Sequence, residues 1–73
     1  MNPQEIKEID ERILHLKAKE ECLILLYHQI KDQPDMDIVT SLTHRASILV
    51  ELVTLLNSLT VLYKERHVMI MQN

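Results

Sequence analysis

The sequence contains no glycine, tryptophan or phenylalanine among its 73 residues. Phosphate-cradling loops, dinucleotide-binding turns and tight hairpin turns need glycine, because they require a positive φ or a close approach of the backbone. The absence of glycine therefore excludes P-loop, Rossmann and most small all-β folds. The single cysteine, Cys22, has no partner for an internal disulfide, which excludes a disulfide-stapled secreted mini-protein.

A surplus of positive charge is also missing. Eight Lys and Arg residues stand against eleven Asp and Glu residues, for a formal net charge of −3. Nucleic-acid binders usually carry a basic stripe, so we do not expect nucleic acid as a partner. Residues 1–13 have neither a basic segment nor an apolar core of the kind that marks a secretory signal. We therefore expect a cytoplasmic protein.

Clusters of chemically active side chains are absent as well. The four histidines (His15, His28, His44 and His67) never stand three or four residues apart, and none lies beside Cys22. This spacing matches no zinc signature. The acidic neighbour Glu21 would not activate the Cys22 thiol. We expect no catalytic residue, no cofactor and no metal, and hence a protein that is not an enzyme.

What the chain does have is aliphatic side chains at helical spacing, within a composition that is 47% hydrophobic. Asn2 followed by Pro3 is typical of a helix start, with Asn2 as the N-cap. In the first half, apolar residues then recur at alternating intervals of three and four, which is a heptad repeat. The repeat consists of Ile6, Ile9, Ile13, Leu16, Leu23, Tyr27 and Ile30, with Glu20 as its interruption. We predict a helix over residues 3–31.

Pro34 separates this helix from a second one. The residue before a proline is biased away from the α region, and Asp35 or Asp37 can cap the helix that follows. We predict a connection over residues 32–35 and a second helix over residues 36–71. A connection this short suits antiparallel helices. The expected fold is therefore all-α, a single antiparallel two-helix hairpin over residues 1–73, completed by a partner or by oligomerisation.

A second heptad row predicts how the helices pair. The row expected to face the first helix is Ile38, Leu42, Arg45, Leu49, Leu52, Leu56, Leu59, Tyr63, Arg66 and Ile70. Setting Tyr27 opposite Ile38 brings the two polar interruptions, Glu20 and Arg45, onto one rung. We interpret this pair as a register pin, because a slip of one heptad would set each charge against aliphatic side chains. The same register leaves the residues beyond Tyr63 as an overhang.

The second helix is more apolar than one partner helix can cover. A packed helix buries a stripe of roughly 100°, and aliphatic residues also lie outside the predicted row. We predict an interface with another polypeptide, formed by Ile48, Val53, Leu55, Leu62, Val68, Met69, Ile70 and Met71. The Met-rich end could dock or fray. A membrane span over residues 46–63 is not expected, because Glu51 lies in it among several Ser, Thr and Asn residues.

Three segments stand out together: residues 31–35, a polar connection containing Asp, Pro and Gln, the aliphatic stretch 48–53, and residues 62–67. In these segments the chain resembles the small helical-hairpin co-chaperones of bacterial type III secretion needle subunits. The resemblance implies a larger helical-repeat partner, which with the hairpin keeps the needle subunit soluble before export. It also implies association with a secretion system and a role in virulence. The alternative is a homodimeric four-helix bundle that regulates by binding RNA or a transcription protein.

Overall fold

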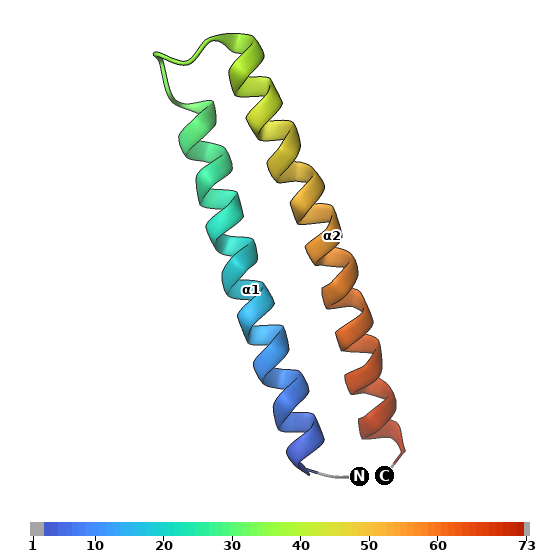
Figure 1. Cartoon of the computed structure of the whole chain (residues 1–73). Helices are drawn as coiled ribbons and strands as arrows, with labels where there is room; N and C mark the ends of the chain where they lie inside the picture. The colour runs from blue at the N-terminus through green and yellow to red at the C-terminus, as the bar shows by residue number, and fades with distance from the viewer. Residues whose placement is uncertain (1–2, 73) are drawn as a thin grey trace.

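The computed structural model describes residues 3–72 and contains two long helices, α1 over Pro3–Lys31 and α2 over Ile38–Met71. They lie side by side and antiparallel, with the connection at one end of the molecule and both chain termini at the other (Figure 1). The molecule is 55 Å long and 15 Å by 11 Å across. The expected all-α helical hairpin is thus confirmed. Pro3 begins α1, while the predicted cap Asn2 lies outside the described residues.

The connection between the helices is fixed by a cap. α1 ends at Lys31, and the N–H of Asp32 still donates to the carbonyl of His28 at 3.0 Å. Asp37 is the N-cap of α2, which begins at Ile38 rather than at residue 36. Its carboxylate accepts hydrogen bonds from the Thr40 N–H at 2.8 Å and the Thr40 hydroxyl at 2.7 Å. One free donor at the start of α2 is thereby satisfied.

One row of α1 faces α2, and it is the row predicted from the sequence. Every residue of α1 that is not exposed belongs to it: Ile6, Ile9, Ile13, Leu16, Glu20, Leu23, Tyr27 and Ile30. Ile9, Ile13 and Leu23 are the buried members and form one half of the core. The rest of α1 is exposed and consists mainly of charged and polar side chains, together with Leu14, Ile24, Leu25 and Leu26.

The row of α2 that faces α1 differs from the predicted one. We call it the inner seam: Ser41, Arg45, Ile48, Leu52, Leu55, Leu59, Leu62, Arg66 and Met69, which are all the residues of α2 that are not exposed. It shares Arg45, Leu52, Leu59 and Arg66 with the prediction. The remaining predicted members point elsewhere, so α2 is rotated about its axis by roughly half of the ~100° between successive residues. Ile48 is 6% exposed and its neighbour Leu49 is 48% exposed.

The register also differs, by one heptad. The guanidinium carbon of Arg45 lies 5.9 Å from the centroid of the Tyr27 ring, where the prediction set Ile38. Glu20 and Arg45 form no ion pair, so the predicted register pin is wrong. That rung would have buried a carboxylate and a guanidinium in mid-hairpin, where the loss of hydration offsets their attraction. Over residues 3–72 the one ion pair is instead Arg66 Nε to Asp10 Oδ1, at 2.6 Å.

The shifted register removes the predicted overhang at the end of α2. Arg66 reaches Asp10 near the start of α1, and Met69 packs against the hydrophobic core. Figure 1 shows the two helices ending at the same level, with α2 in orange and red beside the blue start of α1. The last turns of α2 are therefore part of the hairpin.

Candidate functional site

A second heptad row runs along α2 and is exposed over its whole length. We call it the outer seam: Val39, Leu42, Ala46, Leu49, Val53, Leu56, Thr60, Tyr63, His67 and Ile70. Its intervals alternate between three and four residues, like those of the inner seam, and this is the spacing at which one helix packs along another. α1 does not cover it, because the two seams point about 100° apart around α2.

The exposure of the outer seam is large for apolar side chains. Leu49, Leu56 and Tyr63 are about half exposed, and Val39 and Val53 more than half. None of its ten positions carries Asp, Glu, Lys or Arg. A contiguous exposed apolar face of this kind is typical of an interface.

The aliphatic hydroxyl of the outer seam, that of Thr60, is already hydrogen-bonded within the helix. Thr60 Oγ1 donates to the carbonyl oxygen of Leu56 at 2.9 Å. Beside the seam, Thr43 donates to the carbonyl of Val39 at 2.8 Å in the same way. A buried donor without a partner costs free energy, and these bonds remove that cost if the seam is covered. The hydroxyls of Thr43 and Thr60 therefore need no further partner if another helix covers the seam.

The residues predicted for a partner interface fall into three groups. Ile48, Leu55 and Leu62 are buried against α1, and Met69 is half-buried against the core. For these four the expectation of a free surface is corrected. Either these residues or the predicted Leu42, Leu49 and Leu56 could complete a heptad with the shared Arg45, Leu52, Leu59 and Arg66, and α1 covers these residues. Val53 and Ile70 belong to the outer seam, and Val68 and Met71 are exposed outside it.

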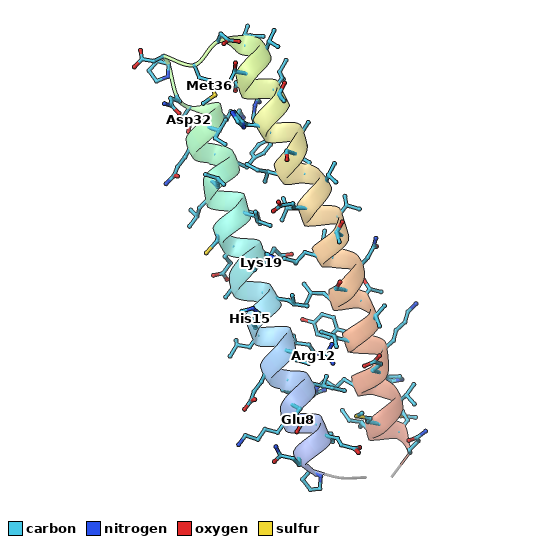
Figure 2. The ribbon with its side chains drawn as sticks, in the orientation of Figure 1. Glu8, Arg12, His15, Lys19, Asp32 and Met36 are labelled. Carbon is cyan, nitrogen blue, oxygen red and sulfur yellow. The ribbon has the colours of Figure 1, made fainter. Side chains whose placement is uncertain are left out.

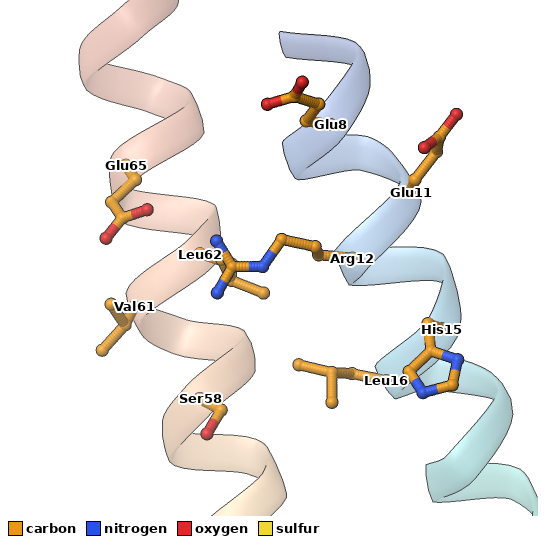
Figure 3. Close-up of a pocket in the computed structure, with 9 residues that line it drawn as sticks. All are labelled: Glu8, Glu11, Arg12, His15, Leu16, Ser58, Val61, Leu62 and Glu65. Carbon is orange, nitrogen blue, oxygen red and sulfur yellow. The ribbon is translucent and has the colours of Figure 1, made fainter. Parts of the chain in front are cut away.

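The other side of the hairpin carries an open groove between the helices. It is lined by Glu8, Glu11, Arg12, His15, Leu16, Ser58, Val61, Leu62 and Glu65 (Figure 3). In this close-up the Arg12 side chain reaches from α1 across to α2, above Leu62 and towards Glu65. Figure 2 shows Glu8, Arg12, His15 and Lys19 following one another along α1. Sequence reasoning did not identify this groove, because it depends on the register.

Few other side chains offer chemistry. Within residues 3–72 no group of three or more His, Cys, Asp or Glu side chains is placed to hold a metal ion. Cys22 is a free, exposed thiol. The backbone N–H of Thr40, helped by its hydroxyl, holds the pKa of Asp37 below its ordinary value of 3.8. That shift reflects the cap of α2.

Among residues 3–72 one helix is long and apolar enough to cross a membrane, judged by length and composition. α2 contains an 18-residue window with a mean hydropathy of 1.7, of which 22% is buried. Core helices of soluble proteins and signal sequences share this length and composition.

Comparison of the chain with known protein families, with curated proteins and with solved structures finds no match in any of the three.

Proposed function

We propose that the chain is a non-enzymatic protein-interaction module that binds another α-helical polypeptide along the outer seam of α2. The observation that carries this proposal is the second complete heptad row on a helix whose first row is already occupied. Heptad rows pack by inserting side chains into holes of a facing helix, so the geometry favours a helical partner over a globular loop surface.

A protein partner accounts for the exposed face better than a bilayer does. α1 lies along α2 over its whole length, so a spanning α2 would draw α1 into the hydrocarbon region. Over residues 5–21 the exposed face of α1 carries many charged side chains, among them Lys7, Lys17 and Glu21. Charged groups in the hydrocarbon region are costly. A helix–helix contact requires no such transfer.

The resemblance to needle-subunit co-chaperones gives the module a specific role. In this role the hairpin joins a larger helical-repeat chaperone in the bacterial cytoplasm, and together they keep a secretion substrate soluble. The outer seam, rather than Ile48, Leu55 and Leu62, then meets the partner, since those three side chains are buried in the hairpin. The hairpin itself contributes a neutral apolar surface and no chemistry.

Co-expression tests this role directly. The chain is produced with the helical-repeat protein and the needle subunit of its own operon, and the soluble fraction of the needle subunit is measured. Leu49→Asp combined with Leu56→Asp places two charges in the outer seam, and we expect the needle subunit to become insoluble.

The matched control places two charges on exposed aliphatic positions outside the seam, Leu14→Asp and Val61→Asp, and should leave the needle subunit soluble. Needle solubility that is unaffected by the outer-seam charges, or that needs only the helical-repeat protein, would contradict the proposal.

A further inference from the structure

The outer seam is symmetric about the point between Val53 and Leu56. Read forwards from Val39 or backwards from Ile70, its intervals are the same: three, four, three, four and so on. Two copies of α2 can therefore lie antiparallel with every position of one seam facing a position of the other. Such a contact uses the same patch on both copies, as a two-fold interface requires.

Side chains that face each other in this antiparallel arrangement are complementary in size. The antiparallel arrangement sets Val39 against Ile70, Leu42 against His67, Ala46 against Tyr63, Leu49 against Thr60, and Val53 against Leu56. Most of these layers combine a small or β-branched side chain with a larger one, the pattern that lets facing helices interdigitate. A parallel pair would instead stack Ala46 on Ala46, leaving a void, and Tyr63 on Tyr63, with two rings in one layer.

Charge and polarity agree with a self-complementary contact. The seam has no Asp, Glu, Lys or Arg, and its polar side chains Thr60, Tyr63 and His67 face apolar ones in this register. Packing the seam against that of a second copy therefore brings no like charges together within the seam. The Thr60 hydroxyl, which would enter the contact opposite Leu49, keeps its hydrogen bond to the Leu56 carbonyl. Antiparallel helices also oppose their macrodipoles.

The hairpin alone leaves its core thin. Among residues 3–72 seven apolar side chains are buried, and none of the side chains there falls below 2% exposure. Chains of this size without a disulfide or a metal usually gain stability from idealised packing or from association. A second hairpin would cover the outer seam and add a second apolar layer to the first.

We infer that, in the absence of another partner, the outer seam binds a second copy of the chain in antiparallel register centred between Val53 and Leu56, giving a four-helix assembly. This inference rests on the proposed function, in which the outer seam is the binding surface. It states that a second copy of the chain covers this surface when no other partner is present. A heterologous partner would then bind by displacing the second copy.

Light scattering on the purified full chain tests association. The expected mass is twice the 8.6 kDa of one chain. Leu56→Asp should return the mass to that of one chain with its helical circular dichroism retained, whereas the control Val61→Asp should stay dimeric. A wild-type chain that is monomeric at micromolar concentration overturns the inference, and so does a monomer that binds neutral phospholipid vesicles through the seam.

Cross-linking tests the register. In a Cys22→Ser background, tagged Ala46→Cys protein is mixed with untagged Tyr63→Cys protein and oxidised under mild conditions. The antiparallel register brings these two positions together, so the mixed disulfide should exceed both homodisulfides several-fold. A dominant Ala46→Cys homodisulfide would show a parallel pair and overturn the register.

The two proposals fail separately. A monomeric chain that still solubilises the needle subunit, and loses this effect with the outer-seam charges, refutes the self-association alone. A dimer that forms as described while the outer-seam charges leave needle solubility unchanged refutes the co-chaperone role alone.

Discussion

Arg45 of α2 lies over the ring of Tyr27 of α1, with its guanidinium carbon 5.9 Å from the ring centroid. The contact fixes the register at the connection end of the hairpin, and the Arg66–Asp10 pair does the same at the end with the termini. Arg45 Nε is buried and has no hydrogen-bond partner, so the ring is the main compensation for its lost hydration. Both arginines of the inner seam are thus placed by α1.

A double-mutant cycle separates the two possible partners of Arg45. Tyr27→Leu and Arg45→Met should show a coupling of about 0.5–2 kcal/mol in the free energy of unfolding, as expected for a cation over an aromatic ring. Glu20→Gln and Arg45→Met should be additive within about 0.5 kcal/mol, because Glu20 makes no ion pair with Arg45. The measurement is urea unfolding followed by circular dichroism. A larger coupling to Glu20 than to Tyr27 would restore the rejected register.

Adjacent residues on α2 distinguish its two seams. Ile48→Ala should lower the free energy of unfolding by about 2–5 kcal/mol at every protein concentration, because it opens a cavity in the core. Leu49→Ala should change the free energy of unfolding of the single hairpin by no more than about 0.5 kcal/mol. It should reduce only the additional stability that association provides at higher protein concentration. Thermal melts at two concentrations tell these effects apart. Equal losses at low concentration would mean that both residues face α1.

The ion pair between Asp10 and Arg66 is half exposed and should contribute little. Asp10→Asn is expected to cost about 0.2–1 kcal/mol in low salt, because exposed pairs gain little Coulomb energy. The cost should shrink in 1 M salt, where the screening length falls to about 3 Å. Glu11→Gln, on an exposed neighbour outside this pair, is the control and should change the stability less than Asp10→Asn does. A cost that is independent of salt would indicate a structural defect instead of a lost charge pair.

The cap of α2 makes the hairpin sensitive to acid. Hydrogen bonds from Thr40 lower the pKa of Asp37 in the folded chain, so its contribution is present above the ordinary value of 3.8 and is lost as the pH falls through the lowered value. Asp37→Asn keeps a capping oxygen but cannot titrate, so its stability should depend less on pH below about 4. Asp35→Asn, in the same connection, should leave the loss of stability at low pH unchanged. Unfolding monitored from pH 6 to pH 2 measures both.

The sequence was enough to predict α1 and its packing row, because one heptad row is apolar along the whole helix, whereas the other faces are mainly charged as far as Glu21 and become aliphatic only around residues 24–26. It was not enough for α2. Leu42, Leu49 and Leu56 on one side, and Ile48, Leu55 and Leu62 on the other, complete the same heptad with a shared row. Hydrophobic periodicity cannot choose between them. An uncovered apolar row was therefore foreseen, but which one it is depends on contacts such as Arg45 with Tyr27.

The two methionines at the end of α2 test whether its last turns belong to the hairpin. Met69 packs against the core, whereas Met71 is 70% exposed. Met69→Ala should lower the melting temperature by several degrees, since about 1 kcal/mol shifts a chain of this size by about 4–8 °C, and Met71→Ala should not. Truncation after Lys64 removes both Met69 and the Arg66 partner of Asp10, so it should cost more than Met69→Ala. Truncation without loss of stability would instead assign these turns to an overhang, and the register shown by Asp10 and Arg66 would be wrong.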